Sequence, residues 1–349
     1  MVSTERGSPT DRATSHSVRA RSGIAHRSAQ SENRTTVASL PAFTTADSRA
    51  GEAWTTFLAI EEVAGRSVDD TVMEPVRNAV AAIFGVVSIR RAATEDSAVE
   101  DPRVAACVDF AEQFVVDVSG MTDDQRGAMT SAMGADAFLF VRTLFVTDVF
   151  TRGRIAIARL FADSAVHALS GVGSTKIAPG DDAVDLWALL ERFMQQVALL
   201  DALDPLTTEL IRLRGARIHN CRLCQSRRSV KAMDSAGVER AGIFDAIDDY
   251  ELADLDVRHI VALRLTDALV TQPGLIDEAL SADVHRLFSD AETVEILFDV
   301  IRNAANKIAV AFGADAPIVV DGVEFYDIDA HGDVVANVDV MVVRNAMAG

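Results

Sequence analysis

The stretch from residue 209 to residue 231 reads E-L-I-R-L-R-G-A-R-I-H-N-C-R-L-C-Q-S-R-R-S-V-K. It holds two of the chain's three cysteines, Cys221 and Cys224, as a C-x-x-C pair, together with a single acidic residue, Glu209. Seven Lys and Arg side chains surround them, in a chain whose formal net charge is −19. Because the thiolate is the reactive form of cysteine and nearby cations favour it, this composition indicates a site for a charged sulfur.

The same stretch predicts two helices joined by a short turn. We expect one helix over 205–219 and another over 221–235, with Asn220 as the N-cap of the second helix and Gly237 as its C-terminal cap. Both cysteines then lie in a first turn, where free backbone N–H groups and the helix dipole stabilise an anion. Because residues three apart share one face of a helix, the two sulfurs can meet in a disulfide.

Two further side chains are candidates for chemistry at the cysteines. Glu209 lies on the first helix and can face the cysteines across the helix pair, and a carboxylate near two thiols can relay protons. Arg228 is one turn past Cys224 on the same helical face, so it is the best candidate partner for a thiolate. The other arginines of the stretch can instead lie on a solvated surface, where they pair with acidic residues elsewhere in the chain.

The cysteine pair has two alternative interpretations. A C-x-x-C pair is half of many zinc sites, and His219 and His259 could supply further ligands, although the spacing of a metal site is not evident. The pair can also be structural and inert. The third cysteine, Cys107, lies in the apolar stretch V-A-A-C-V-D-F and is expected to be a small buried hydrophobe. We expect no metal and no cofactor.

Helices are expected over most of the chain, because alanine is abundant and aromatic residues make up only 6% of it. Pro75 and Pro102 can each open a helix at its first turn, and Thr122 is a good N-cap. The strongly apolar stretch 135–161 is expected to be a buried central helix. The other expected helices cover 54–63, 75–91, 101–118, a short segment after Thr122, 182–203, 255–271, 273–281 and 290–312.

The C-terminal part changes to a two-residue period. It reads I-V-V-D-G-V-E-F-Y-D-I-D-A-H-G-D-V-V-A-N-V, with turn signals at Asp321-Gly322 and His331-Gly332. Residues 316–349 are therefore predicted to hold a small β-hairpin packed on the helical body. The D-x-D-x-H-G run within it is not a calcium loop, because position twelve holds Val338 where a bidentate glutamate is needed.

Four segments are predicted along the chain. Residues 1–50 are rich in Ser, Thr and Arg with almost no large apolar side chain, so they cannot fold alone; their composition also resembles an organelle transit peptide. Residues 51–169 and 182–315 are predicted helical domains joined by a linker at 170–182, and 316–349 form the hairpin tail. A weak repeat at an offset of 153 residues would make the first helical domain a degenerate copy that lacks the cysteine pair.

Bulk composition narrows the classes of protein. No run of 18 apolar residues free of charge exists, so no membrane span is expected. The acidic balance disfavours nucleic acid as a partner, because its phosphates would be repelled. Three cysteines do not make a disulfide framework, so a reducing cytoplasm is the expected location.

A glutamate followed by eleven residues and a C-x-x-C pair, in a helical chain, resembles the alkylhydroperoxidase D and carboxymuconolactone decarboxylase superfamily. Its usual pattern is E-x11-C-x2-C-x3-H, which Glu209, Cys221 and Cys224 match in spacing. The resemblance covers about 182–315 and implies an all-α bundle that forms a symmetric homo-oligomer. The family's histidine position holds Arg228 here.

The resemblance also implies roles for individual residues. Cys224 would attack a peroxide, Cys221 would resolve the intermediate, and Glu209 would accept the proton. Arg228 can stabilise a thiolate but cannot shuttle protons near neutral pH, and His219 is the candidate substitute for that task. The implied partners are a hydroperoxide or other small-molecule substrate and a reductant that is a protein or a small thiol.

Three functions follow as expectations. The leading one is a thiol-dependent peroxidase or thiol–disulfide oxidoreductase of the alkylhydroperoxidase D type. The alternative is a non-catalytic, redox-sensing oligomeric member of the same superfamily. The third is a lyase of the carboxymuconolactone decarboxylase type, which does not need redox cysteines.

Overall fold

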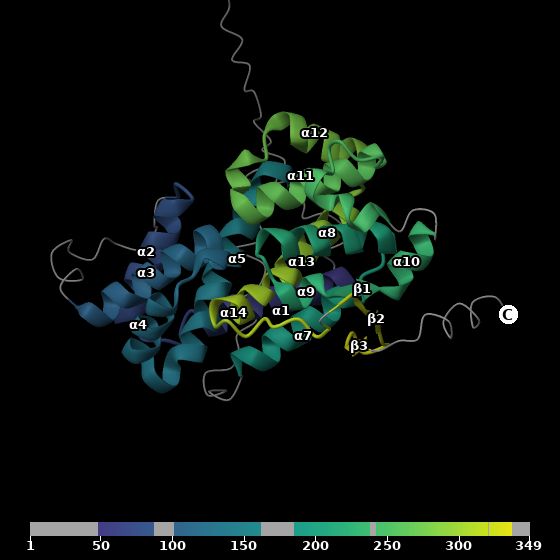
Figure 1. Cartoon of the computed structure of the whole chain (residues 1–349). Helices are drawn as coiled ribbons and strands as arrows, with labels where there is room; N and C mark the ends of the chain where they lie inside the picture. Colours follow the sequence, from purple (N-terminus) through teal and green to yellow (C-terminus); the bar gives the residue numbers. More distant parts are fainter. Residues whose placement is uncertain (1–47, 87–100, 162–184, 238–241, 320, 337–349) are drawn as a thin grey trace, which may run out of the picture. The chain divides into compact units, whose positions relative to one another are not determined.

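The computed structural model describes residues 48–86, 101–161, 185–237, 242–319 and 321–336, all of which lie in the compact unit Ala38–Gly349. This part of the chain is mostly helical and carries a small three-stranded sheet (Figure 1), so the predicted predominance of helix is confirmed. Its α-helices are α1 (Arg49–Ala64), α2 (Asp70–Ile83), α3 (Pro102–Asp117), α4 (Asp123–Met133), α5 (Ala137–Phe161), α7 (Leu186–Ala198), α8 (Pro205–Ile218), α9 (Arg222–Gln225), α10 (Val230–Ala236), α11 (Val257–Thr271), α12 (Glu278–Leu287), α13 (Asp290–Ala304) and α14 (Asn306–Ala311). The strands are β1 (Arg227–Ser229), β2 (Glu324–Ile328) and β3 (Val334–Ala336).

Local capping explains where several predicted helices begin. Asp101 caps α3 by accepting the backbone N–H of Arg103, and Pro102 occupies the first turn. Thr122 and Gln125 form a reciprocal capping box at the start of α4. Helix α5 is buried over much of its 25 residues. The predictions of a helix over 101–118, of Thr122 as an N-cap and of a buried helix over 135–161 are therefore confirmed.

The predicted helix over 75–91 is wrong at both ends. Helix α2 begins earlier because Asp69 caps it, with its carboxylate accepting the N–H of Thr71 at 2.9 Å, and Pro75 lies inside the helix. At the other end Ile83 is the last helical residue, and Gly85 follows with a φ of 65°. The left-handed region favours glycine and does not continue a helix, which explains the stop.

Two predicted helices in the second half differ from the structure. The predicted helix 273–281 is a 3-10 turn, Pro273–Leu275, followed by α12, which starts where Asp277 accepts the N–H of Leu280. The predicted helix 290–312 is interrupted at Ala305, which separates α13 from α14. Several other predicted segments lie outside the described residues: 1–47, the linker 170–182 and the chain beyond 336.

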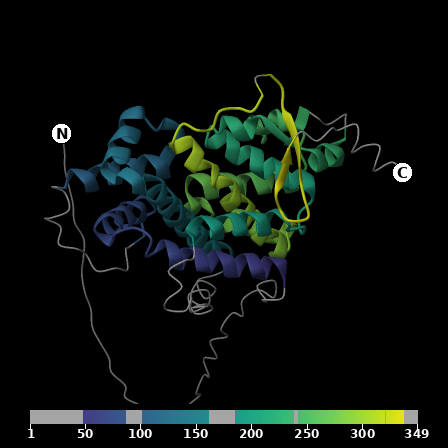
Figure 2. The same ribbon diagram turned by 90° about the horizontal axis from the view of Figure 1, so that it is seen from below.

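The C-terminal hairpin is confirmed, and it gains a strand that was not predicted. Strands β2 and β3 form an antiparallel hairpin (Figure 2). Their register places Tyr326 opposite Ala336. Strand β1 pairs parallel with β2, with Ser229 opposite Tyr326. The predicted continuous helix 221–235 is therefore wrong, because α9, β1 and α10 occupy this stretch. Ser229 starts α10 by accepting the N–H of Ala232, and Gly237 ends it as predicted.

Helix α8 lies between two hydrophobic clusters. Ile211 and Ala216 belong to a large cluster that draws side chains from α1 to α14. Leu210 and Leu213 belong to a smaller cluster with residues of α10, α11 and the segment around Phe244. A helix that is apolar on both sides is held on both sides, so α8 is a rigid support for the polar side chains that it carries.

Cys107 is buried in the large cluster, as predicted. Burial raises the pKa of its thiol to about 11. This cysteine therefore stays a neutral thiol near neutral pH, and it is a suitable internal reference for the reactivity of the other two.

Two acidic side chains of α13 are buried where this helix packs on α8. Glu295 accepts the backbone N–H of Ala202 at 2.7 Å, whereas Oδ2 of Asp299 has no hydrogen-bond partner among the described residues. Burial raises the pKa of Glu295 to about 7 and raises the pKa of Asp299 well above its ordinary value. Removing either carboxylate from water disfavours its charged form, so both tend to hold a proton.

Glu295→Gln is expected to make the protein more stable at pH 8 than the wild type, by about 1–3 kcal/mol. An unfolded glutamate loses its proton near pH 4.5, whereas Glu295 in the folded protein keeps it until about 7. The stability that its proton supplies is therefore complete below pH 4.5 and lost as the pH rises through 7. Urea unfolding of both proteins at pH 4, 6 and 8 measures the difference, which should be smallest at pH 4. A difference that does not change with pH would contradict the expectation.

Candidate cysteine site

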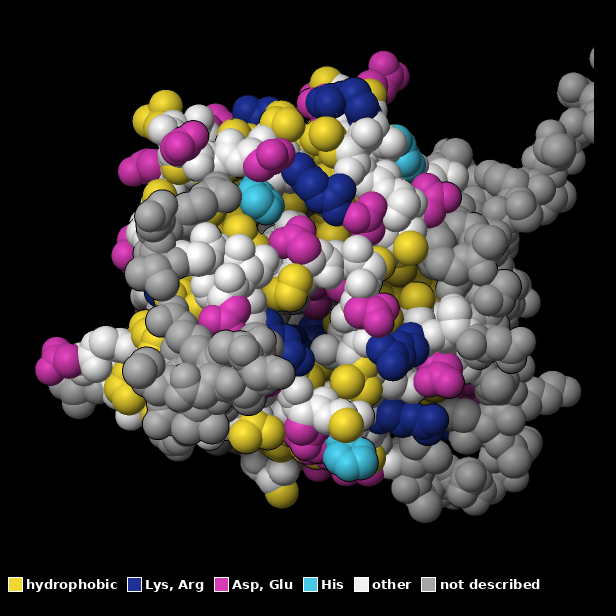
Figure 3. Space-filling model, turned by 90° about the vertical axis from the view of Figure 1, so that its right-hand side faces the viewer, with side chains coloured by type: hydrophobic (Ala, Val, Ile, Leu, Met, Phe, Trp, Pro, Cys, Tyr) yellow, Lys and Arg dark blue, Asp and Glu magenta, His cyan; other side chains and the backbone are white. Residues whose placement is uncertain are grey.

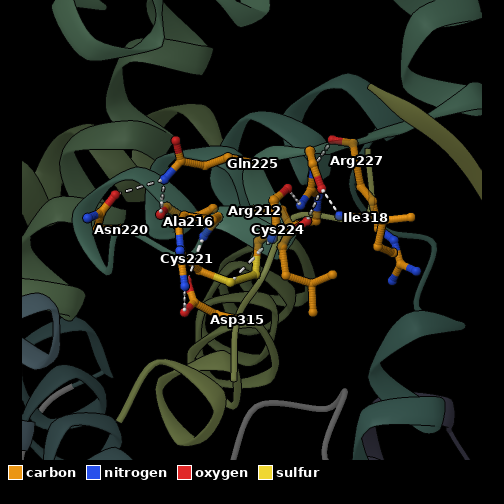
Figure 4. The surroundings of a disulfide bond; sticks show 12 residues. Arg212, Ala216, Asn220, Cys221, Cys224, Gln225, Arg227, Asp315 and Ile318 are labelled. Atoms are coloured by element: carbon orange, nitrogen blue, oxygen red, sulfur yellow. Dashed lines mark hydrogen bonds and ion pairs between the residues drawn. A yellow bond between two sulfur atoms is a disulfide. The ribbon is translucent and has the colours of Figure 1, made fainter. Parts of the chain in front are cut away.

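Cys221 caps the start of α9 and Cys224 lies within this helix, and the two are joined as a disulfide with a Cα–Cα distance of 5.3 Å (Figure 4). The prediction that these sulfurs can bond is confirmed. Asn220 is not the N-cap that was predicted: it takes a φ of 50° in the turn, and Cys221 is the N-cap, with its Sγ accepting the N–H of Cys224 at 3.3 Å. Cys221 is completely buried and Cys224 is 5% exposed.

Asp315 holds the cysteine turn from a distant part of the chain. Its carboxylate accepts the backbone N–H of Arg222 at 2.9 Å and also binds the guanidinium of that residue. Its own carbonyl accepts the N–H of Leu223 at 2.9 Å. The hydrogen bonds from Arg222 lower the pKa of Asp315. Two of the N–H groups at the start of α9 are thereby satisfied, so the two residues between the cysteines are fixed by Asp315.

Glu209 is buried beneath the cysteine turn and is only 1% exposed. The guanidinium of Arg212 binds both of its carboxylate oxygens at 2.7 Å. Tyr326 donates its hydroxyl to Oε2 of Glu209 at 2.8 Å, and the backbone N–H of Ser229 donates to Oε1 at 3.2 Å. The two parallel hydrogen bonds from Arg212 fix the carboxylate of Glu209 in one orientation.

Arg212 joins this carboxylate to the second cysteine. Its Nη1 donates to the carbonyl of Cys224 at 2.8 Å, while its Nη2 also donates to the carbonyl of Arg227 at 2.8 Å. The predicted contact of Glu209 with the cysteines is therefore indirect. The guanidinium of Arg212 links the carboxylate of Glu209 to the backbone carbonyl of Cys224. This contact places a buried cation, already paired with Glu209, at the backbone of Cys224.

Arg228 does not lie on a helix with Cys224, which corrects the predicted position. It is in strand β1, buried, and its Nη1 donates to the carbonyls of Gln225 and Arg227 at 2.9 and 2.8 Å. Burial lowers the pKa of its guanidinium, and the charge of Glu209 acts in the opposite direction. The prediction failed because a break in the helix at Ser226 turns the following residues into the sheet.

His219 lines a different cavity from the one that opens beside Cys224. It lines a small cavity of about 20 Å³ together with Asp148, Arg152 and Lys307. Burial, followed by the positive charges of Lys307 and Arg152, lowers the pKa of His219 to about 3. The imidazole is therefore uncharged near neutral pH, and its predicted role as a proton shuttle stays a prediction that this geometry does not favour.

A cavity of about 280 Å³ opens beside Cys224. It is bounded by residues of α7, α8, α9, β1, α13, α14 and the hairpin. Arg212, Arg227, Arg302 and Tyr326 are among the polar residues of its wall. Cys221 does not line this cavity, so Cys224 is the sulfur that a small molecule inside it would meet. On the face of the molecule that Figure 3 shows, acidic, basic and hydrophobic side chains intermingle.

The hairpin forms one wall of this cavity and is held in place by contacts with α7 and β1. Gly332, in the hairpin turn with a φ of 88°, approaches α7 so closely that a Cβ there would meet the carbonyl oxygen of Gln195 at 2.3 Å. The side chain of Gln195 donates to Asp333 at 2.8 Å. On the other side, Arg227 of β1 binds Glu324 of β2 at 2.9 Å. Only glycine fits at this turn, because any side chain would push the hairpin off α7.

Three residues that hold the site together through hydrogen bonds were not predicted in that role. Arg212 had a local signal, since it stands three residues after Glu209 on one helical face. Tyr326 and Asp315 had none, because they reach the site only through the packing of the C-terminal segment. Among the described residues, no three His, Cys, Asp or Glu side chains gather as a metal site, so the zinc alternative finds no ligand set there.

Comparison with known proteins gives one relationship. A segment of 244 residues is 40% identical to a protein of Mycobacterium tuberculosis, "Uncharacterized protein Rv2313c" in strain ATCC 25618 / H37Rv and "Uncharacterized protein MT2376" in strain CDC 1551 / Oshkosh. The match covers 68% of this chain and 82% of the mycobacterial protein. The chain belongs to the Rv2313c family. No family model matches it, and no solved structure matches it significantly.

Membership of the Rv2313c family carries no activity with it, so the site itself is the basis for function. No helix among the described residues is both long enough and apolar enough to cross a membrane.

Proposed function

We propose that this member of the Rv2313c family is a thiol-dependent oxidoreductase of the alkylhydroperoxidase D type, which reduces a small hydroperoxide. The observation that carries the proposal is the Cys221–Cys224 disulfide, with Cys224 on the wall of a 280 Å³ cavity and a buried carboxylate joined to it through Arg212. A bonded sulfur pair, an access cavity and a fixed proton acceptor are the parts that such a reaction needs.

The reaction starts from the reduced pair. The thiolate of Cys224 attacks one peroxide oxygen, the O–O bond breaks, and the leaving oxygen departs with a proton as an alcohol. Cys224 then carries a sulfenic acid, which condenses with the thiol of Cys221 to form the disulfide and one water. An external dithiol, small or on a protein, reduces the disulfide and returns two electrons and two protons. Cys224 attacks first because it faces the cavity, whereas Cys221 is buried behind it.

Glu209 receives the thiol proton in this proposal. Its carboxylate is held by Arg212 and accepts further hydrogen bonds from Tyr326 and Ser229, so it lies in a fixed, water-poor position. A positioned base of this kind typically contributes about 10²- to 10⁴-fold to the rate. The proposed homo-oligomer would follow from the family resemblance, in which helices of several copies pack together.

Hydroperoxide consumption tests the function. With tert-butyl hydroperoxide and dithiothreitol, the wild type is expected to exceed the rate of dithiothreitol alone, and Cys221→Ser/Cys224→Ser is expected to fall to that background. Cys107→Ser is the matched control, since it removes a thiol that is buried away from the cavity and should keep the wild-type rate. A wild type that stays at background, or a double variant that keeps the wild-type rate, would sink the proposal.

A redox-sensing role is the second candidate, and one observation favours it. Strand β1 begins three residues after Cys224 and pairs with β2, so the cysteine turn and the hairpin are directly connected. In that case, reduction would change the protection of the β1–β2 amides in hydrogen exchange without sustained peroxide turnover. The lyase alternative instead requires that a lactone acid is consumed equally by the wild type and the double cysteine variant.

A further inference from the structure

We infer that Tyr326, contributed by the C-terminal hairpin, donates the proton that the leaving oxygen of the hydroperoxide needs. This inference rests on the proposed function and adds a residue and a leaving-group dependence to it. Cleavage of the O–O bond by a thiolate produces an alkoxide, which is a poor leaving group unless it is protonated as it departs. A donor in the cavity wall is therefore required.

Few groups in the wall of the cavity can give up a proton. The guanidinium groups of Arg212, Arg227 and Arg302 do not lose protons near neutral pH. Glu191 and Asp333 are exposed residues, so their carboxyl groups face water rather than an enclosed substrate. The remaining side chains with hydrogens on nitrogen are amides, which are not acids. Tyr326 belongs to the same wall as Cys224, and its side chain carries a neutral O–H group.

The hydroxyl of Tyr326 is already connected to the proposed proton acceptor. It donates to Oε2 of Glu209 at 2.8 Å, and its side chain is buried, with 9% of the residue exposed. The guanidinium of Arg212 lies 5.4 Å from the centre of its ring and also contacts the carbonyl of Cys224. Burial raises the pKa of the Tyr326 hydroxyl, so the phenol is fully protonated at physiological pH.

The proton balance closes through these three groups. The thiol of Cys224 gives its proton to Glu209 and becomes the attacking thiolate. As the O–O bond breaks, Tyr326 gives its hydroxyl proton to the departing alkoxide and accepts the proton from the carboxyl of Glu209. A hydroxyl can do both, because it has one donor hydrogen and two acceptor lone pairs. The net reaction turns one thiol and one hydroperoxide into one sulfenic acid and one alcohol.

The hairpin keeps Tyr326 in this position. Tyr326 is opposite Ser229 in the parallel pair with β1, and Ser229 itself donates its N–H to Glu209. Next to it, Asp327 binds Lys231 of α10 at 3.1 Å. The strand is thus fixed both along its backbone and by an ion pair, as a proton donor that must meet a small substrate requires.

The chain offers a matched control in its second tyrosine. Tyr250 is also buried and donates its hydroxyl to a carboxylate, Asp267, at 2.9 Å. That carboxylate is likewise held by an arginine, Arg214, whose guanidinium lies 5.2 Å from the tyrosine ring. The two sites lose the same kind of hydrogen bond when tyrosine becomes phenylalanine, but Tyr250 does not line the cavity at Cys224.

The test measures oxidation of the reduced protein in a single turnover, with tert-butyl hydroperoxide and with a peroxycarboxylic acid. The carboxylate that leaves a peracid is stable without a proton, so it does not need a donor. Tyr326→Phe is expected to slow the reaction with the alkyl hydroperoxide about 10- to 100-fold and to leave the peracid reaction within about 3-fold. Tyr250→Phe is expected to match the wild type with both oxidants.

Two outcomes overturn the inference while leaving the proposed function intact: Tyr326→Phe reacting like the wild type with the alkyl hydroperoxide, or slowing equally with both oxidants. A wild type that does not react with either oxidant defeats the proposed function itself, and the inference with it. If Tyr326→Phe does not fold, the solvent isotope effect of the wild type decides. The rate in H₂O should exceed that in D₂O for the alkyl hydroperoxide and not for the peracid, and equal isotope effects would overturn the inference.

Discussion

Asp148→Asn is expected to lower the free energy of unfolding by about 3–5 kcal/mol, because it leaves two buried cations without their shared counter-charge. Asp148 is fully buried in α5. Its carboxylate binds Arg152 at 2.7 Å on the same helix and Lys307 of α14 at 2.6 Å. Burial alone would raise the pKa of Asp148, but Arg152 and Lys307 outweigh it and hold this pKa below its ordinary value.

The cluster around Asp148 connects four elements. Arg152 donates to the carbonyls of Val270 and Thr271 at the end of α11, at 2.7 and 3.0 Å, and to the carbonyl of Val115 in α3 at 2.7 Å. These carbonyls have no partner within their own helices, so Arg152 satisfies groups that would otherwise be buried without hydrogen bonds. Loss of Asp148 would loosen the contacts of α3, α5, α11 and α14 together.

Urea unfolding at pH 7 checks this expectation. Asp283→Asn is the control, because Asp283 binds Arg286 at 2.7 Å in a pair whose side chains are 40% and 57% exposed. Exposed pairs contribute about 0–1 kcal/mol, so this variant should unfold close to the wild type. Equal midpoints for Asp148→Asn, Asp283→Asn and the wild type would contradict the role given to the cluster.

Glu209→Gln is expected to slow the oxidation of Cys224 by a hydroperoxide about 10²- to 10⁴-fold. Glutamine keeps the shape of the side chain but cannot take the thiol proton, and it leaves the guanidinium of Arg212 without a charged partner. The protein should also lose stability, since breaking a buried ion pair costs about 3–5 kcal/mol. The rate is therefore measured on folded protein, at a temperature well below the onset of unfolding for the variant.

Glu324→Gln is the matched control for Glu209→Gln. Glu324 is also buried and binds a cavity arginine, Arg227, at 2.9 Å, but it has no hydrogen bond to Tyr326 or Arg212 among those found in the described residues. Both variants remove a buried carboxylate charge next to the cavity, and only one of them removes the proposed base. Equal rates for Glu209→Gln and Glu324→Gln would show that Glu209 has no special place in the reaction.

The parts of the site that the sequence predicted are close together in the chain. Glu209, Cys221 and Cys224 stand on consecutive elements, so helix period and turn position were enough to bring them near one another. The bounds of α8 followed from Pro205 at its start and from the polar residues after Ile218 at its end. Here local propensity and tertiary structure agree.

The parts that could not be predicted depend on pairing between distant segments. Tyr326 follows Glu209 by 117 residues and reaches it only because β2 pairs with β1. Strand β1 consists of Arg227, Arg228 and Ser229, which have no β-branched or aromatic side chain, so nothing local marks it as a strand. A continuous helix was the better local prediction, and the hairpin overrides it.

Helix α5 shows the same limit for buried charge. Its apolar composition correctly predicted a buried helix, but the pattern gave no indication that Asp148 and Arg152 would be buried with it. Their partner, Lys307, lies 159 residues from Asp148. A charged side chain is buried only when its partner is in place, and the partner is a property of the fold rather than of the local sequence.

The most direct measurement is the fate of the three thiols after one equivalent of peroxide. The wild type is first reduced fully, and the reductant is removed under anaerobic conditions. The protein is then mixed with tert-butyl hydroperoxide, and its remaining free thiols are labelled and located by peptide mass spectrometry. We expect a disulfide between Cys221 and Cys224, a free Cys107, and one equivalent of tert-butanol. A Cys221–Cys224 pair that remains reduced while the peroxide persists would contradict the account.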